Sequence, residues 1–359
     1  MTTNEIVGQF RLEGKVTEIR PLGSGLINDT YLVKTEGDAP DYVLQRINNA
    51  IFTDVDLLQH NIEAVTGHIR RKLEAAGEKD IDRKVLRFLP LKDSPKTYWT
   101  DGQTYWRISV FIKDSFTYDS VTPEYSEFAG ENFGRFEAML ADIKEPIGET
   151  IPSFHNMELR ARQLEEAVAA NKAGRLDDPE VQAILAEIRA NVDEMCFAEK
   201  LHREGKLPKR ICHCDTKISN MLFDAEGHVL CVIDLDTVMP SFVFSDYGDF
   251  LRTAANTVAE DDPATDKVAF RLDIFEAFTR GYIKGADFLL PIERDNLPYG
   301  ALLFPFMQAV RFFADYINGD TYYKIRYPEH NLVRTRNQMA LWRSAKANLD
   351  YMKQFIAQL

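Results

Sequence analysis

The chain has 359 residues, of which 45% are hydrophobic and 28% charged, so it is long enough for two lobes and is typical of a globular protein. Lysine and arginine number 43 and aspartate and glutamate 56, so the formal net charge is −13 and most of the surface would repel a nucleic acid. No apolar run approaches the roughly 18 residues of a membrane span, and the first ten residues lack the pattern of a secretion signal. We therefore expect a cytoplasmic protein with neither a membrane nor a nucleic acid as its partner.

The first hundred residues alternate short strands with one helix. The helix is predicted over roughly Asp54 to Ala75, with Thr53 as its N-cap. Asp101-Gly102 is the strongest hairpin signal in the chain. The strand-like runs are Val16–Leu22, Ile27–Lys34, Tyr42–Ile47, Val85–Leu89 and the two arms of Lys96–Ile112.

From Thr122 onward the hydrophobic period becomes helical. Thr122 is a predicted N-cap, with Pro123 at the first helical position. The further predicted helices are Met157–Ala173, Pro179–Glu204, Tyr247–Ala259, Lys267–Ile283, Pro298–Ile317 and Thr335–Gln358. The predicted fold class is α+β, with residues 1–112 as a small β-rich lobe and residues 113–359 as a larger, mainly helical lobe.

A polar loop between short strands interrupts the helical region. Ala225-Glu226-Gly227 supplies a hairpin turn between the last two of these strands. The loop from His213 to Asn220 has the spacing H-x-D-x-x-x-x-N, and Asp234 closes the next strand. This is the pattern of a protein-kinase catalytic loop followed by a metal-binding aspartate. The alternative is an Asp/Asn-rich turn between ordinary strands.

The residue types in this loop fit phosphoryl transfer. Moving the γ-phosphoryl group of ATP to a hydroxyl needs oxygen ligands for Mg²⁺ and a carboxylate that accepts the hydroxyl proton. We assign Asp215 as the base, and Asn220 and Asp234 as the magnesium ligands. Lys217 projects to the same side of an extended loop as Asp215 and could meet the γ-phosphate. ATP and Mg²⁺ are the expected cofactors.

With this loop in place, the N-terminal elements suggest a nucleotide site. Small residues at the tip of the first hairpin would let backbone N–H groups approach phosphate oxygens. Gln45 stands where a kinase carries its phosphate-pairing lysine, and Arg46 points to the opposite face of the strand. Glu63 is either the partner of that missing lysine or an ordinary solvated charge. The predicted nucleotide-binding residues, including a hinge, are Gly23, Ser24, Gly25, Asn28, Thr30, Gln45, Glu63, Phe111, Ile112 and Lys113.

The cysteines are expected to be reduced core residues. Cys212 and Cys214 flank His213, but C-x-C is the wrong spacing for a zinc knuckle and no second pair exists. We therefore expect no zinc site.

These motifs resemble those of the aminoglycoside phosphotransferase and choline kinase superfamily, and the resemblance runs nearly end to end. The last two of the matching stretches resemble its N-acetylhexosamine 1-kinase branch. The stretches are GSGLINDTYLV at Gly23–Val33, YVLQRIN at Tyr42–Asn48, HCDTKISNMLFD at His213–Asp224, VIDLDTVMP at Val232–Pro240, DYGDFLR at Asp246–Arg252, and RFFADYINGDTYY with YPEHNLVRTR within Arg311–Arg336.

The resemblance implies a two-lobed protein-kinase-like fold and phosphorylation of a sugar, GlcNAc or GalNAc, at its anomeric C1 hydroxyl. It implies acceptor contacts from Arg311 and Tyr322, and we assign Asp236 with them. Two positions depart from the branch. Leu26 stands where the branch has histidine, and Cys214 where it has asparagine.

Other interpretations remain open at this level. The acceptor could be choline, homoserine, methylthioribose or an aminoglycoside. A choline site would favour an aromatic cage, and an aminoglycoside site a cluster of acids. Gln45 also allows a nucleotide-binding pseudokinase, although Asp215, Asn220 and Asp234 together oppose it. Arg311 and Asp315, four residues apart on a predicted helix, could form a simple surface salt bridge instead of a sugar site.

Overall fold

The computed structural model describes residues 1–23, 28–118 and 121–359. Its residues form two compact units. The first unit comprises residues Met1–Thr117, Asp142–Pro152 and Asn220–Met239, and the second comprises Tyr118–Ala141, Ser153–Ser219 and Pro240–Leu359. The sequence predicts a single division at residue 112, whereas the first unit takes in two later segments. Asn61 explains part of this, because its side-chain amide donates to the carbonyls of Gly148 at 2.8 Å and Val238 at 3.1 Å.

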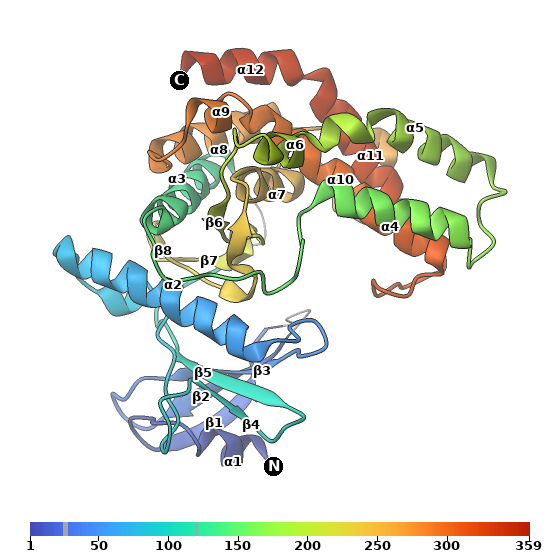
Figure 1. Ribbon diagram of the computed structural model, residues 1–359. Coiled ribbons are helices and arrows are strands. Elements are labelled where there is room, and N and C mark those ends of the chain that lie inside the picture. The colour runs from blue at the N-terminus through green and yellow to red at the C-terminus, as the bar shows by residue number, and fades with distance from the viewer. Residues whose placement is uncertain (24–27, 119–120) are drawn as a thin grey trace. The chain divides into compact units, whose positions relative to one another are not determined.

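The first unit is built on a five-stranded antiparallel sheet in the order β1-β2-β3-β5-β4, seen with α2 alongside in Figure 1. The strands are β1 Val16–Pro21, β2 Asp29–Thr35, β3 Tyr42–Ile47, β4 Tyr98–Thr100 and β5 Tyr105–Val110. One face carries Tyr42, Leu44, Trp106 and Ile108, which pack on the short helix α1 (Thr3–Val7) in a buried cluster. Because side chains alternate along a strand, Gln45 and Arg107 occupy the opposite face.

The predicted strand at residues 85–89 is wrong. This segment makes a single bridge, Phe88 with Ser109, and two hydrogen bonds to β5, from Leu89 N–H to the Ile108 carbonyl and from Val110 N–H to the Arg87 carbonyl, both 3.0 Å. It lies there because β4 pairs only with the first half of β5, so the edge of the second half is open to it.

The helix α2 spans Val55–Ala75, and its N-cap is Asp54 rather than the predicted Thr53. The Asp54 carboxylate accepts the N–H of Leu57 at 2.9 Å. The buried side chains Leu58, Ile62, Val65 and Ile69 recur at helical spacing, which gives α2 one apolar face. A short 3₁₀ turn, η1 (Ile81–Arg83), follows α2.

A second hairpin completes the first unit. Its strands are β7 Met221–Phe223 and β8 Val229–Val232. The 3₁₀ turn η2 (Ile218–Asn220) leads into it, and η3 (Leu235–Thr237) follows it. The predicted turn is present, because the Asp224 carboxylate accepts the N–H groups of Glu226 and His228 and Gly227 has φ of 86°.

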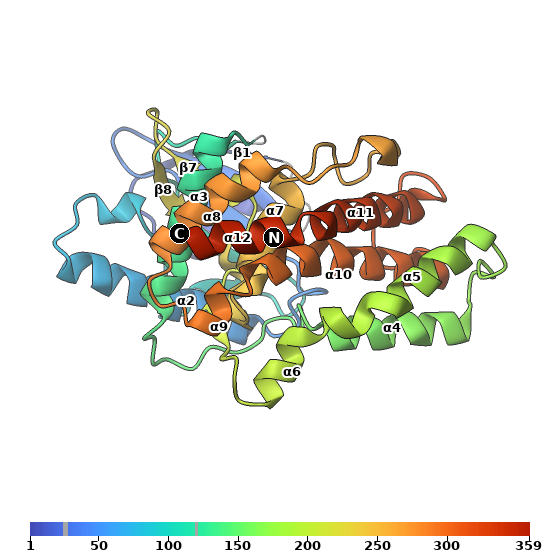
Figure 2. The same ribbon diagram turned by 90° about the horizontal axis from the view of Figure 1, so that it is seen from above.

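The second unit is mainly helical. Two predicted helices each divide into two, since Cys196 (φ −88°, ψ 15°) and Asn348 (φ −104°, ψ 9°) leave helical geometry. Figure 2 shows α4, α5, α10 and α11 side by side. Among the described residues, no helix is both long and apolar enough to cross a membrane. The helices are α3 Pro123–Leu140, α4 Met157–Ala170, α5 Pro179–Met195, α6 Phe197–Arg203, α7 Phe244–Ala254, α8 Leu272–Gly285, α9 Pro291–Arg294, α10 Leu297–Asn318, α11 His330–Ala347 and α12 Leu349–Gln358, with strands β6 Arg210–Cys212 and β9 Met239–Ser241 and the turn η4 Thr265–Lys267.

Glycines bring α3 and α8 into backbone contact. A Cβ atom at Gly281 would overlap the carbonyl of Glu127, and one at Gly130 would overlap the carbonyl of Phe278. This close approach lets the hydroxyl of Tyr282 in α8 donate a hydrogen bond to Glu137 of α3.

Candidate active site

The polar loop of the second unit is shaped by Asp246 of α7. The Asp246 carboxylate accepts the N–H of His213 at 2.6 Å and the N–H of Cys214 at 2.7 Å. Its carbonyl accepts the Thr216 hydroxyl at 2.7 Å. Cys214 has φ of 62°, so these bonds hold the chain in a left-handed turn that a non-glycine residue rarely adopts. Asp246 therefore holds the backbone before Asp215 and the side chain of Thr216 after it.

His213 supports the loop from within the core. It is fully buried, with its ring edge-on to Phe133 and Phe136 at centroid distances of 5.8 and 5.9 Å. Its Nδ1 atom accepts the N–H of Asp215 at 3.3 Å. His213 thus positions the loop and is not exposed to a substrate.

Asp215 and Lys217 form an accessible ion pair on this loop. The Lys217 Nζ lies 2.6 Å from the Asp215 Oδ1, and their side chains are 41% and 23% exposed. Burial by itself would lower the pKa of Lys217, but the carboxylates of Asp215 and Asp249 outweigh it and raise that pKa above its ordinary value. The loop therefore presents a carboxylate with a protonated amine beside it.

Glu137 of α3 lies close to Asp246, the residue that holds the loop. The hydroxyl of Tyr282 donates to the Glu137 Oε2 at 2.9 Å, and the side chains of Glu137, Cys212 and Asp246 all lie within 4.8 Å of one another. Burial, followed by the nearby Asp246 carboxylate, raises the pKa of Glu137 well above its usual range. Burial likewise raises the pKa of the Cys212 thiol, so burial favours the neutral form of both groups.

Glu137 should make the stability of the fold depend on pH. A carboxyl that is protonated when folded and ionised when unfolded binds one more proton in the folded chain. Stability then falls, by at most about 1.4 kcal/mol per pH unit, as the pH rises above the ordinary pKa of 4.5 toward the raised one. Glu137→Gln stays neutral and keeps an acceptor for the Tyr282 hydroxyl, so we expect this variant to lose less stability between pH 5 and 8 than the wild type. Urea unfolding at several pH values measures this, and parallel curves for the two proteins would contradict it.

In the first unit, the β7–β8 hairpin places Asn220 and Asp234 at one end. Met221 pairs with Val232, and the N–H of Ile233 donates to the Asn220 carbonyl at 2.9 Å. Asp234 follows directly, with an exposed side chain and a left-handed backbone (φ 60°, ψ 58°). An amide oxygen and a carboxylate at the mouth of one hairpin are donors that suit Mg²⁺, so these two residues fit the predicted metal site.

Gln45 stands on β3 where a kinase carries its lysine, and it is hydrogen-bonded to Arg107 of β5. The Gln45 Oε1 accepts the Nε–H of Arg107 at 2.9 Å, across the β3–β5 pair. The Arg107 Nη2 lies 2.5 Å from the Asp236 Oδ1. The Asn28 amide donates to the Asp236 Oδ2 at 2.7 Å. Asp236 is buried with both oxygens engaged by side chains of the first unit, and its predicted contact with the acceptor stays a prediction.

Glu63 does not meet Gln45 in this arrangement. Its exposed side chain accepts a hydrogen bond from the Thr97 hydroxyl. Thr30 stands opposite Gln45 on β2. Gly23 has φ of 70° and open space around its Cα. Ser24 and Gly25, together with Leu26, lie outside the described residues.

The predicted hinge is partly occupied by protein contacts. The Phe111 N–H donates to the Asp41 carbonyl at 2.8 Å, and the Ile112 carbonyl accepts the Ser115 hydroxyl at 2.7 Å. The Lys113 carbonyl accepts from Arg83 at 3.3 Å. A role of Phe111, Ile112 and Lys113 in adenine binding stays a prediction.

In the second unit, Arg311 lies between aromatic rings. Its guanidinium carbon is 5.4 Å from the ring centre of Phe154 and 5.7 Å from that of Tyr323, and its Nη1 donates to Gln308 at 3.1 Å. Neighbouring Tyr322 is 66% exposed. The alternative of a surface salt bridge between Arg311 and Asp315 is wrong.

Asp315 instead shapes the segment that carries the two tyrosines. It is buried, and its carboxylate accepts the N–H groups of Thr321 and Tyr322 at 2.9 Å and of Tyr323 at 3.0 Å. Three charge-assisted hydrogen bonds therefore hold this segment just beyond the end of α10.

A second arginine, Arg160 of α4, lies near Arg311 and was not predicted. Burial, together with the charge of Arg311, lowers the pKa of Arg160 to about 10. Burial and both arginines also lower the pKa of His155 well below its usual range. Within the described part of the chain, the hydrogen bonds of Arg160 go to Gln163 and to the carbonyls of Ser153 and Phe154, and that of Arg311 goes to Gln308, so neither arginine has a carboxylate partner. No sequence signal marks Arg160, because its neighbourhood arises from packing.

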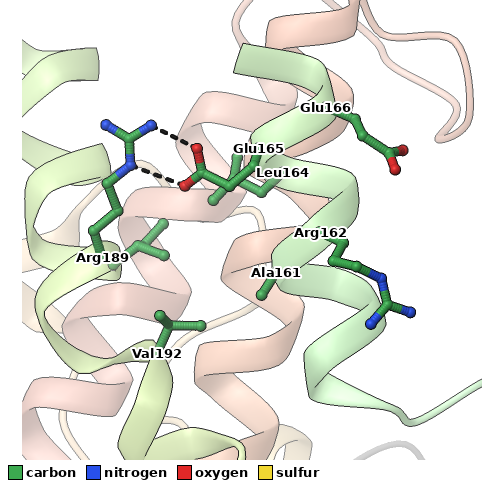
Figure 3. A pocket seen from close by; sticks show the side chains of 8 residues that line it. Ala161, Arg162, Leu164, Glu165, Glu166, Arg189 and Val192 are labelled. Carbon is green, nitrogen blue, oxygen red and sulfur yellow. Dashed lines mark hydrogen bonds and ion pairs between the residues drawn. The ribbon is translucent and has the colours of Figure 1, made fainter. Parts of the chain in front are cut away.

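A separate pocket of about 380 Å³ lies between α4 and α5 (Figure 3). Leu164, Ile188 and Val192 contribute to its lining, and Glu165 and Arg189 form a doubly hydrogen-bonded pair at its edge. None of the predicted site residues lines it, so it is distinct from the candidate site.

Residues 18–282 match the model of the phosphotransferase enzyme family. Among solved structures, an aminoglycoside phosphotransferase from Alicyclobacillus acidocaldarius is 13% identical, with a TM-score of 0.63 over 100% of this chain and 97% of that chain. A Plasmodium vivax ethanolamine kinase is 14% identical, with a TM-score of 0.55 over 96% and 86%.

A third similar structure is the ADP-bound aminoglycoside phosphotransferase APH(2'')-Ib, which is 15% identical with a TM-score of 0.52 over 92% and 95% of the two chains. At these identities the likeness concerns the fold. It confirms the predicted α+β, protein-kinase-like architecture of a small sheet-based lobe and a larger helical one. Arg311 and Tyr322 lie beyond the segment that the family model matches.

Proposed function

We propose that this chain, which belongs to the phosphotransferase enzyme family, transfers the γ-phosphoryl group of ATP to the anomeric C1 hydroxyl of an N-acetylhexosamine. GlcNAc and GalNAc are the acceptors we infer, and Mg²⁺ is the inferred metal. The ADP bound to the similar APH(2'')-Ib structure supports an adenine nucleotide as the donor.

The observation that carries phosphoryl transfer is the Asp215–Lys217 pair on its anchored loop. An accessible carboxylate can take the proton of an attacking hydroxyl. The ammonium 2.6 Å away can offset negative charge on the transferred group. Because Asp246 binds the residues on both sides of Asp215, the base is held in place before a substrate binds.

The metal fits the donors present in the first unit. Asn220 and Asp234 would hold Mg²⁺, which when bound supplies charge neutralisation of the nucleotide phosphates. The exposed Asp234 carboxylate provides the charge, and the Asn220 amide a neutral oxygen.

The choice of acceptor rests on Arg160 and Arg311. Two adjacent arginines without a carboxylate among the described residues would repel a cation, which disfavours choline and aminoglycosides. A neutral sugar suits them, because guanidinium groups donate to hydroxyl and acetamido oxygens. Tyr322 and Tyr323 offer ring faces for the C–H surface of a sugar. The anomeric hydroxyl is a favourable acceptor because the ring oxygen makes it more acidic than the other hydroxyls.

Removing the Arg311 side chain should weaken binding of the sugar and leave binding of the nucleotide almost unchanged. We expect Arg311→Ala to raise the KM for the sugar by about tenfold or more, the effect of losing one or two hydrogen bonds from a charged donor, with an almost unchanged KM for ATP. Arg162→Ala, at an exposed arginine on α4, is the matched control. Steady-state kinetics with each substrate varied in turn measures both constants, and equal changes in the two would contradict an acceptor role.

The acceptor class itself is tested with a panel. ADP release is measured with GlcNAc, GalNAc, choline, homoserine, methylthioribose and an aminoglycoside, each with ATP and Mg²⁺. Turnover of the hexosamines supports the proposal. Turnover of choline or an aminoglycoside but of no hexosamine would contradict the proposed acceptor and would leave the proposed kinase activity standing.

A further inference from the structure

The face of β3 that carries Gln45 has no lysine or arginine, but a buried arginine lies on the neighbouring strand. Position 45, where protein kinases carry the lysine that pairs with nucleotide phosphates, holds a neutral glutamine. Arg107 on β5 is directly opposite Gln45 in the strand register. It is 2% exposed, and in the part of the first unit that the structure describes it is the only buried lysine or arginine.

The guanidinium of Arg107 is held on two of its three nitrogen atoms. Nε donates to the Gln45 Oε1, and Nη2 pairs with the Asp236 Oδ1. Nη1 is buried and has no hydrogen-bond partner among the described residues. Two N–H groups of a charged side chain are therefore left without an acceptor.

The surroundings of Arg107 connect it to both predicted ends of a nucleotide site. Asp236 lies two residues after Asp234, the predicted metal ligand, and also accepts from Asn28. Asn28 lies five residues after Gly23 of the first hairpin, and its Oδ1 accepts the N–H of Asn48 at 2.9 Å. The Thr150 hydroxyl binds the Asp236 carbonyl at 3.0 Å. Arg107 thus sits in a fixed polar network within the first unit.

We propose that Arg107 supplies the positive charge that binds the nucleotide phosphates, in place of the lysine that β3 lacks. This rests on the proposed function, because it takes the nucleotide to be the donor. Gln45 orients the guanidinium, and Asp236 offsets its charge while the site is empty of phosphate. A buried donor without an acceptor is destabilising. A phosphate oxygen would satisfy Nη1 with a charge-assisted hydrogen bond.

The test separates phosphate binding from adenosine binding. Titration calorimetry measures the affinities of the full-length protein for Mg²⁺·ADP and for adenosine. We expect Arg107→Gln to weaken Mg²⁺·ADP by about tenfold or more and to leave adenosine within about twofold. The double variant Gln45→Lys/Arg107→Gln, which returns the cation to β3, should recover most of the lost affinity. Arg46→Gln removes an exposed arginine from the other face of β3 and serves as the control.

A second pair of variants covers the case in which Arg107→Gln fails to fold because Asp236 is left unpaired. Arg107→Gln/Asp236→Asn removes both charges, and it is compared with Asp236→Asn alone. The proposal requires the double variant to bind Mg²⁺·ADP at least about tenfold more weakly than Asp236→Asn. Equal binding by the two, or equal losses for adenosine and Mg²⁺·ADP, would overturn it. Wild-type protein that bound no nucleotide would overturn the proposed function as well, which distinguishes the two failures.

Discussion

Replacing Asp215 with asparagine should lower kcat by about 10² to 10⁴-fold, the usual cost of losing a general base. An amide cannot accept the proton of the attacking hydroxyl. The fold should be retained, because Asp246, His213 and Thr216 hold the loop. Thermal melts check stability, and nucleotide titration checks that binding is kept.

Asp350→Asn is the matched control for this variant, since Asp350 is an exposed aspartate of α12 in the same unit. An Asp215→Asn protein that kept most of its kcat would show that Asp215 is not the base. Loss of activity in parallel with loss of stability would assign Asp215 a turn-capping role instead.

Replacing Asp234 with alanine should weaken the Mg²⁺-dependent part of nucleotide binding by about 100-fold or more. Mutating a residue that only supports a metal ligand already lowers metal affinity by about 10- to 100-fold. Asp234 would be a charged ligand itself. Asn220→Ala should have a smaller effect, since the amide carries no charge. Affinity for the sugar should change little in either variant.

Titration of a non-hydrolysable ATP analogue with and without Mg²⁺ measures this effect. Asp38→Ala, at an exposed aspartate of the first unit, is the control for charge removal. The same metal dependence in wild type, Asp234→Ala and Asn220→Ala would remove both residues from the metal site.

Local patterns predicted much of the fold. The strand at Tyr42–Ile47 and the helix start at Thr122 were predicted to the residue, because alternation and capping act over a few neighbouring positions. The helix at residues 179–204 was predicted as continuous, whereas it breaks at Cys196, where the backbone φ and ψ depart from helical values. Residues 85–89 were predicted as a strand, and only the short length of β4 explains why they lie along β5 as an irregular segment.

The candidate site divides in the same way. Asp215, Asn220 and Asp234 belong to one short sequence pattern, so spacing alone pointed to them. Arg107 and Arg160 belong to no such pattern. A role for Arg107 can be inferred only from the pairing of β3 with β5, which brings it against Gln45. A role for Arg160 can be inferred only from the packing of α4, which brings it near Arg311.

The same limit applies to buried groups. Asp246 was part of a matching stretch, but its hold on the loop needs α7 folded beside β6. The raised pKa of Glu137 follows from burial next to Asp246, which sequence spacing does not reveal. Long-range contacts, rather than residue types, decide these roles.

The position of the phosphate on the product tests the proposed reaction most directly. Wild-type protein is incubated with ATP, Mg²⁺ and GlcNAc labelled with ¹³C at C1, and the product is examined by ³¹P and ¹³C NMR. We predict a phosphate coupled to the labelled C1 carbon, formed together with one equivalent of ADP. A phosphate on any other carbon, or no phosphorylated GlcNAc or GalNAc while another alcohol is turned over, would contradict the proposed reaction.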